Sequence, residues 1–319
     1  MTYINSIGLI SPQSTIEDGH YVCAEPVYKD FINPVQLRRM SRILKMGLGA
    51  SSICINNLPE VEIDAIIVGT GLACITDLEK FLFSVLDENE QVLSPTPFIN
   101  SSHNTVASQI AMMHKITGYN NTYCHRGSSF EPALQDALML LNENDAKHIL
   151  VGGIDEYSQH YVIMMNQERN MKNVMLGEGA VFFILEKELK GDTFAEFKDI
   201  HSFLIMNHED LNDENSKFIK TEISEFLIKN SLDTADIDLF VSGKNGNCIT
   251  DGIYDELEKD YFQNSEIVYY KHLCGEYMTS TAYAMALAAR HLKDQKRKHA
   301  LIYNHYNYIN HSLILMQTV

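Results

Sequence analysis

The features that this sequence lacks already narrow what the protein can be. No run of 18 or more apolar residues occurs in its 319 residues, so a membrane span is not expected. Residues 1–6 show no basic region followed by a long apolar run, so we expect no signal peptide. Positive charge is scarce, with 25 Lys and Arg against 42 Asp and Glu and a formal net charge of −17. This balance argues against a general nucleic-acid binder, which needs basic surface to displace counterions.

Cysteine is present, but its spacing predicts neither disulfide bonds nor a metal site. The six cysteines show neither a compact disulfide pattern nor paired metal-ligand spacing, and they are Cys23, Cys54, Cys74, Cys124, Cys248 and Cys274. Reduced thiols in a cytoplasmic protein are the simplest interpretation. His103, His114 and His125 lack the carboxylate pattern of a zinc site. Gly69-Thr70-Gly71 lacks the downstream glycine and acidic residue of a dinucleotide site. We therefore expect no metal and no cofactor.

Strand-like and helix-like segments alternate along the chain, which predicts an α/β protein of one large domain or two packed halves. Short apolar runs predict strands at residues 65–68, 122–124, 148–151, 180–185, 239–241, 267–270, 300–303 and 312–316. Apolar residues at helical spacing predict helices at 77–86, 102–114, 131–141, 216–230 and 279–292. The polar stretch 192–215 is the candidate join between halves, and we place the boundary at 190/191.

Four short motifs occur in a characteristic order. They are Tyr123-Cys124-His125-Arg126-Gly127, Val151-Gly152-Gly153-Ile154-Asp155-Glu156, Gly177-Glu178-Gly179-Ala180, and Lys271 followed by Gly275-Glu276. Together they resemble the β-ketoacyl-acyl-carrier-protein synthases over nearly the whole chain. With residues 97–106, the first motif resembles the chain-length-factor-type homologues of aryl polyene and flexirubin-type pathways. The resemblance implies a duplicated, five-layered αβαβα fold of the thiolase type.

Cys124 is the candidate nucleophile that the resemblance implies. In this family the cysteine opens a buried helix, where backbone N–H groups and the helix dipole lower the thiol pKa. Here Ser128 and Glu131 have capping-box spacing, and Pro132 is tolerated only if the helix begins near Ser129. The alternative is that Cys124 packs as a small hydrophobic residue.

The groups that support decarboxylative condensation are missing from the positions where the resemblance places them. Lys244 or Asn245 stands where the family has its first active-site histidine, and Glu276 stands where it has the second. A carboxylate there would repel a developing enolate. We expect Lys271 to pair with Glu276 as a structural contact. His305 or His125 could replace the lost imidazoles by position.

The stretch that resembles the family's gate for the acyl pocket has lost its glycines. It reads His305-Tyr306-Asn307-Tyr308, which argues against a flexible gate, because bulky side chains restrict the backbone. We expect Tyr306 and Tyr308 to line whatever substrate pocket remains.

Two functions follow from this resemblance. The first is a catalytically impaired, chain-length-factor-type subunit that forms a heterodimer with an active ketosynthase and shapes its tunnel. The second is a Cys124-dependent acyltransferase or ketosynthase acting on carrier-bound acyl thioesters, with His305 or His125 as base. A structural homodimer is a third possibility. An acyl carrier protein, itself acidic, would need a basic face. The candidates are Arg38, Arg39, Arg42 and Lys45, and Lys293, Lys296, Arg297 and Lys298.

Overall fold

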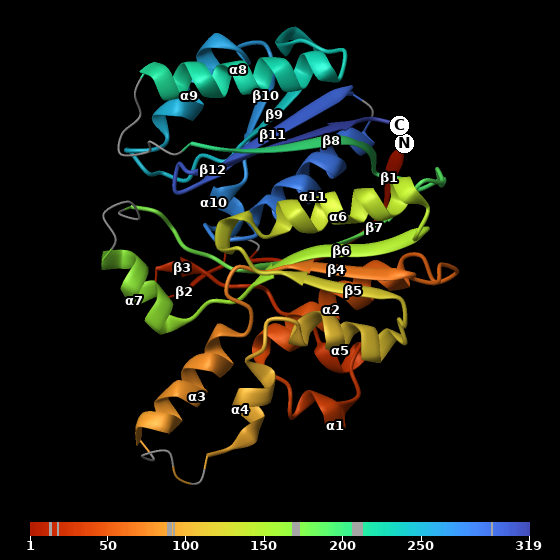
Figure 1. Ribbon diagram of the computed structural model, residues 1–319, viewed down its shortest axis with the longest axis vertical. Helices are drawn as coiled ribbons and strands as arrows, with labels where there is room; N and C mark the ends of the chain where they lie inside the picture. Colours follow the sequence, from red (N-terminus) through yellow and green to blue (C-terminus); the bar gives the residue numbers. More distant parts are fainter. Residues whose placement is uncertain are drawn as a thin grey trace.

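The protein is seen here in a computed structural model (Figure 1). It describes residues 1–12, 15–17, 19–87, 91, 93–167, 173–205, 213–294 and 296–319. The strands are β1 (Thr2–Ile10), β2 (Ile16–Glu17), β3 (His20–Tyr21), β4 (Ala65–Gly69), β5 (Tyr119–Tyr123), β6 (His148–Asp155), β7 (Gly179–Glu186), β8 (Ala195–Leu204), β9 (Leu239–Ser242), β10 (Glu266–Tyr269), β11 (His299–Tyr306) and β12 (Asn310–Gln317).

The helices lie between these strands in the sequence. They are α1 (Pro34–Leu37), α2 (Arg42–Asn56), α3 (Ile75–Asp87), α4 (Pro95–Asn100), α5 (Thr105–His114), α6 (Phe130–Glu143), α7 (Gln159–Gln167), α8 (Asp213–Lys229), α9 (Gly252–Asp260), α10 (Lys271–Cys274) and α11 (Ser280–Lys293). Short 3₁₀ turns occupy Tyr28–Asp30, Arg126–Ser128 and Thr234–Asp236. In the part of the chain that the structure covers, no helix is long and apolar enough to cross a membrane.

The strands fall into two groups of five with the same internal order. The described strands of the main sheet run β10-β9-β11-β12-β8-β1-β7-β6-β4-β5. In the first group, β1 pairs antiparallel with β7, and β7 pairs antiparallel with β6. In the second group, β8 pairs antiparallel with β12, and β12 pairs antiparallel with β11. The remaining pairings are parallel in both groups. They are β6 with β4 and β4 with β5 in the first group, and β11 with β9 and β9 with β10 in the second. A short antiparallel pairing of β1 with β8 joins the groups.

Helices cover both groups in layers (Figure 1). The pair α6 and α11 lies between the two groups and shares one apolar cluster with both. On the outer faces, α2 and α5 cover the first group, and α8 and α9 cover the second. Because β4 and β7 are covered on both faces, every residue of these strands is buried, which explains their continuous apolar sequence. The small side chains of α11, mostly alanines, allow close packing between the sheets.

Most predicted elements are present, with shifted ends, but several regions differ from the expectation, and the helices α7 and α9 are among the elements that were not predicted. The long strand β1 and the buried helix α2 were not predicted at all. The stretch 192–215, predicted as an irregular join, contains the ten-residue strand β8 and the start of α8. Residues 206–212 lie outside the described residues. The expected boundary between the halves, at 190/191, falls between the end of β7 and the start of β8.

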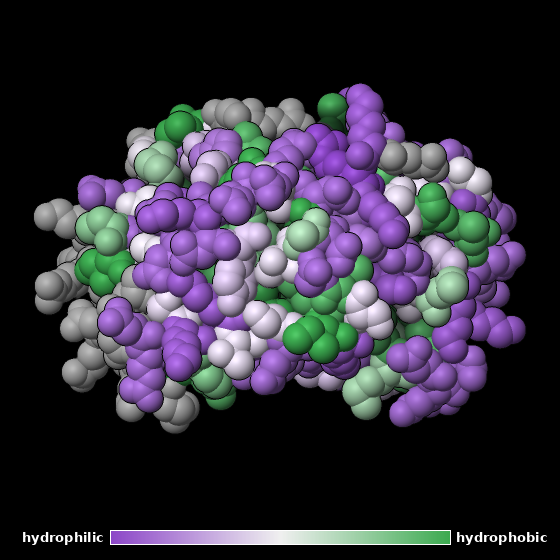
Figure 2. Space-filling view, turned by 90° about the horizontal axis from the view of Figure 1, so that it is seen from above, coloured by the Kyte–Doolittle hydropathy of each residue, from purple (hydrophilic) through white to green (hydrophobic). Residues whose placement is uncertain are grey.

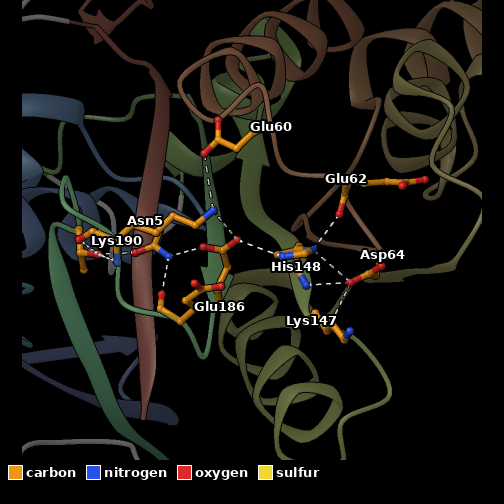
Figure 3. Close-up of polar contacts among 10 residues, drawn as sticks. Asn5, Glu60, Glu62, Asp64, Lys147, His148, Glu186 and Lys190 are labelled. Carbon is orange, nitrogen blue, oxygen red and sulfur yellow. Dashed lines mark hydrogen bonds and ion pairs between the residues drawn. The ribbon is translucent and has the colours of Figure 1, made fainter.

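A polar cluster fastens β1, β6 and β7 at the end of the sheet where β6 begins (Figure 3). Its centre is the buried carboxylate of Glu186, which lies 3.1 Å from the Nζ of Lys190 and 3.5 Å from the Nε2 of His148. Asn5 also donates to this carboxylate. Asp64 accepts from the backbone N–H of His148 at 2.9 Å. Each buried charge has a partner, so the cluster is structural.

Candidate active site

The candidate site lies beyond the carboxyl ends of β4, β5, β6, β9 and β11, the strands that run parallel within each group. Loops at these ends meet at one edge, which is where α/β sheets place their ligands. Asp155, at the end of β6, organises this edge. Its buried carboxylate accepts from the N–H of Gly71 at 2.7 Å and from the N–H of Thr279 at 2.8 Å. Burial raises the pKa of Asp155 to about 6.

Cys124 follows β5 directly but does not open a helix. The helix α6 begins only at Phe130, which confirms the start near Ser129 that Pro132 predicted. The thiol of Cys124 donates to the carbonyl oxygen of Gly71 at 3.4 Å, and only a protonated thiol can make this bond. Burial, and then the charge of Asp155, raise the pKa of Cys124. Its surroundings therefore favour the neutral thiol over the nucleophilic thiolate.

A tight turn separates Cys124 from α6. Arg126 has a φ of 53°, a left-handed conformation that is uncommon for a side chain of this size. Ser129 fixes the turn, because its hydroxyl accepts from the N–H of His125 at 2.8 Å and donates to the carbonyl of Arg126 at 2.6 Å. The predicted capping box does not form. Glu131 is instead buried and accepts from the hydroxyl of Ser312 at 3.2 Å, and burial raises the pKa of its carboxyl group.

Lys271 and Glu276 meet and form the expected pair. The Nζ of Lys271 lies 2.7 Å from the Oε2 of Glu276, and the amide of Asn245 donates to the same oxygen at 2.7 Å. Only 2% of the Lys271 side chain is exposed. Lys244 belongs to a different contact, since it pairs with Asp255. Of the two residues proposed for the first histidine position, the structure therefore brings Asn245, and not Lys244, to Glu276.

His305 and Tyr306 also reach the site, whereas Tyr308 does not. His305 is buried, and its Nδ1 accepts from the N–H of Tyr308 at 3.4 Å. Burial, and then the charges of His311 and Lys271, hold the pKa of His305 well below its usual range, so the ring is neutral. Tyr308 is only 3% exposed and packs in the core around α8 and α9. The expectation that Tyr308 lines a substrate pocket is therefore wrong, because the turn after β11 sends its side chain into the core.

Cavities surround this cluster. A small one of about 30 Å³, enough for about one water molecule, is lined by Asn245, Glu276, His305 and Tyr306 among others. A second, of about 540 Å³, has Arg126 and Tyr306 in its wall. A third, of about 430 Å³, is lined by Lys244, Lys271 and His272 among others. Cys124 does not line any of these three cavities.

The site also contains residues that the sequence did not single out. A Cβ atom on Gly127 would lie 2.1 Å from the ring of Tyr306, so this ring fills the space in front of the turn. Gly127 could have been noticed as a glycine in a turn next to the candidate nucleophile. Nothing in the sequence, however, pairs it with a residue that lies 179 positions later.

The strand order, the layers and the site at the carboxyl edge define a thiolase-like ketosynthase fold that covers the whole chain. The profile of the beta-ketoacyl synthase N-terminal domain matches residues 17–176, half of the chain, and the chain therefore belongs to the beta-ketoacyl synthase family. A search of curated proteins finds no match.

Solved structures match over all of this chain. The ishigamide ketosynthase/chain length factor matches with a TM-score of 0.85 and 16% identity, over 99% of that chain. The ketosynthase (ApeO) in complex with its chain length factor (ApeC) from Xenorhabdus doucetiae matches with a TM-score of 0.81 and 12% identity, over 98% of that chain. A type II polyketide synthase acyl-carrier protein in complex with its ketosynthase (AntDE:AntF) matches with a TM-score of 0.78 and 13% identity, over 99% of that chain. At these identities the likeness shows the fold alone.

Proposed function

We propose that this chain is a catalytically impaired, chain-length-factor-type subunit that completes an active ketosynthase in polyene or fatty-acid-like biosynthesis. The observation that carries the proposal is the arrangement around Glu276. A carboxylate lies where condensation needs donors for an enolate oxygen, and Lys271 and Asn245 already bind it. An enolate at this place would meet a negative charge instead of two imidazoles.

The turn after β5 supports the same proposal. A condensing nucleophile must reach an acyl thioester, but the ring of Tyr306 fills the space in front of Gly127. The thiol of Cys124 points to the carbonyl of Gly71 and has a raised pKa. The alternative function, a Cys124-dependent acyltransferase, needs a thiolate and a neighbouring base. His305, one candidate base, is held by the hairpin after β11 and lines a cavity that Cys124 does not reach.

We also propose that the two groups of strands are duplicated halves, residues 1–190 and 191–319, in the five-layered arrangement of thiolases. Their identical strand order and directions support this division. The join between them is then the segment from the end of β7 to the start of β8.

The free edge of β5 is the surface that we assign to the ketosynthase partner. Within the described residues β5 is the last strand of the sheet and pairs only with β4. Such an edge presents unpaired backbone N–H and C=O groups that can bind a second chain. Exposed methionines flank it on both sides, Met112 on α5 and Met139 on α6, which are 73% and 59% exposed. By contrast, the α8–α9 face is mostly hydrophilic (Figure 2). Two of the matching structures are, by their titles, ketosynthases with chain length factors.

An acyl carrier protein is a further proposed partner, and two ion pairs reduce the number of basic residues available to it. Arg42 is bound to Glu178 and Glu25, and Arg297 is bound to Glu266. Neither guanidinium is therefore free for an acidic carrier. The exposed residues Arg38 and Arg39 remain on the first of the two basic faces.

Co-purification tests the partner proposal. The tagged chain would be co-expressed with the ketosynthase of its own biosynthetic gene cluster, as the wild type and as Met112→Glu/Met139→Glu. Ile228→Glu, on the opposite α8 face and 69% exposed, is the matched control. We expect the wild type and the control to retain the ketosynthase and the double variant to lose it. Mass spectrometry of the isolated chain, incubated with an acyl-loaded carrier, distinguishes this proposal from the Cys124-dependent acyltransferase. An acyl adduct that disappears in Cys124→Ala would overturn our proposal.

A further inference from the structure

The cavity of about 540 Å³ lies between α3, α7, the turn at Arg126 and the end of β11. Figure 1 shows α3 and α7 on the same side of the molecule. We propose that this cavity binds an amphipathic carboxylate, that is, a free carboxylate head on an unbranched apolar chain. Its volume is in the range of pockets that hold small organic ligands. The inference concerns this chain alone and does not depend on the pairing with a ketosynthase.

One part of the wall is apolar and adaptable. It consists of Leu72, Ile75, Met164, Met165 and Met278. Three of these five residues are methionines, whose unbranched and polarisable side chains adapt to ligands of different shapes. A flexible apolar chain is the chemistry that such a wall accommodates.

The other part of the wall carries the positive charge of Arg126. Arg126 lines the cavity, and its guanidinium interacts with the neutral hydroxyl of Tyr306. Among the ion pairs of the described residues none involves Arg126. Glu79, the carboxylate of the same wall, accepts from Ser158 and lies 3.4 Å from the Nδ1 of His160, which also lines the cavity. A guanidinium binds a carboxylate through two parallel hydrogen bonds, so a monoanionic head is the complement of Arg126.

The backbone holds Arg126 at this place under strain. A φ of 53° is unfavourable for a residue with a large side chain, and it persists only where the surroundings impose it. Ser129 imposes it from one side through its two hydrogen bonds, and the ring of Tyr306 packs on Gly127 from the other. The turn therefore presents the guanidinium at the cavity. In this proposal the head of the ligand lies at Arg126, and its tail lies along the methionines.

The charge of its head group distinguishes the proposed ligand from an acyl thioester. A thioester carbonyl carries no net charge, so its binding would gain little from a guanidinium compared with that of a carboxylate. Decanoate and decanamide share a chain of the same length and differ in the charge of the head. A comparison of these two molecules therefore measures the contribution of Arg126 directly.

The test is isothermal titration calorimetry of the full chain with decanoate, below its micellar concentration, and with decanamide. We expect decanoate to bind more tightly than decanamide, and Arg126→Gln to weaken decanoate about tenfold or more while leaving decanamide unchanged. Arg290→Gln, an exposed arginine outside the cavity, should change neither. Glu79→Gln should tighten decanoate, because it removes a like charge from the wall.

Thermal unfolding without ligand confirms that each variant is folded. Equal binding of decanoate and decanamide would overturn the proposal. So would decanoate binding that Arg126→Gln leaves unchanged, or no binding of decanoate to the folded wild type. Decanoyl-pantetheine serves as a further arm. If it binds more tightly than decanoate and is insensitive to Arg126→Gln, the cavity accepts a thioester and the proposal of a free acid is wrong.

Discussion

The ring of Tyr306 lies directly against Gly127, with its Cγ and Cδ2 atoms 2.1 Å from the place where a Cβ would stand. These residues belong to the two segments that flank the site, the turn after β5 and the end of β11. Asn307 and Tyr308 follow with φ angles of 51° and 57°, so the chain reverses immediately into β12. The two segments therefore form one packed unit.

This contact predicts a steric effect that a second substitution relieves. Gly127→Ala should lower the free energy of unfolding by about 1–3 kcal/mol, because the added methyl group overpacks the ring. Adding Tyr306→Ala should reduce the effect of Gly127→Ala to near zero in a double-mutant cycle measured by urea denaturation. Gly191→Ala is the matched control, since nothing lies within 4 Å of a Cβ at that position. An additive cycle would show that the two residues are not in contact.

The parts of the fold that the sequence predicted are those with a clear local signal. The continuous apolar runs of β4 and β7 and the apolar face of α6 were recognised because burial on both faces, or on one stripe, determines their composition. The helix α2 was missed. Ten of its fifteen residues are buried, and they include Gly47, Gly49, Ser51 and Ser52, which weaken any apolar periodicity.

The site was predicted only as far as neighbours in the sequence reveal it. Lys271 and Glu276 lie five positions apart in one motif, and their pairing was expected from the resemblance of that motif to the family. The choice of Asn245 over Lys244, the contact of Gly127 with Tyr306, and the burial of Tyr308 depend on which way a loop turns between distant strands. One sequence does not fix these directions. The same limit explains why Arg126 went unnoticed beside the more conspicuous Cys124.

The buried ion pair of Lys271 and Glu276 predicts that removing one partner destabilises the protein far more than removing both. Glu276→Ala should destabilise the protein by about 3–5 kcal/mol, because it leaves a buried ammonium group without a counter-charge. Lys271→Met in the same chain should restore most of that loss. Asp255→Ala, which removes the partner of Lys244 at the surface, should cost about 1 kcal/mol or less. Chemical denaturation of the wild type and the three variants measures these losses, and equal losses for Glu276→Ala and Asp255→Ala would contradict the structural role of the buried pair.

The proposed loss of both active-site histidines predicts that restoring one of them is not enough. Glu276→His should give no measurable malonyl decarboxylation or condensation, because Asn245 still occupies the other histidine position and Cys124 is not activated. The assay is release of CO₂ from a malonyl-loaded carrier, with the co-purified ketosynthase substituted at its own active-site histidines so that it contributes no decarboxylation. Recovery of activity by this single substitution would show that the site has been assigned to the wrong residues.

Glu156 predicts a loss of stability as the pH rises. Burial raises the pKa of its carboxyl group from 4.5 to about 7 in the folded protein, with the charge of Asp77 adding to the effect. The folded state thus holds a proton that the unfolded chain releases, and this contribution is complete below about pH 4.5 and is lost as the pH approaches 7.

Glu156→Gln keeps the acceptor for the N–H of Thr76 and removes the titration. At pH 8 the variant should be more stable than the wild type by up to about 3 kcal/mol, and the difference should vanish near pH 4. Urea denaturation across this range measures it. Glu143→Gln, exposed at the end of α6, is the control. A pH-independent difference between Glu156→Gln and the wild type would mean that the carboxyl group titrates normally.

The surroundings of Cys124 and Cys248 predict which of the two thiols iodoacetamide alkylates first. This order distinguishes an inert Cys124 from a nucleophilic one. Cys124 donates to a carbonyl oxygen and has a raised pKa, whereas Cys248 is exposed on the loop after β9. Iodoacetamide reacts with the thiolate, so at pH 7.5 we expect Cys248 to be modified at least about tenfold faster than Cys124. Time-resolved peptide mass spectrometry measures both rates in one sample, with Cys124→Ala to assign the peptide. If Cys124 reacts first, its thiol is activated in a way that the contact with Gly71 does not allow, and the acyltransferase function gains the support that the present geometry denies it.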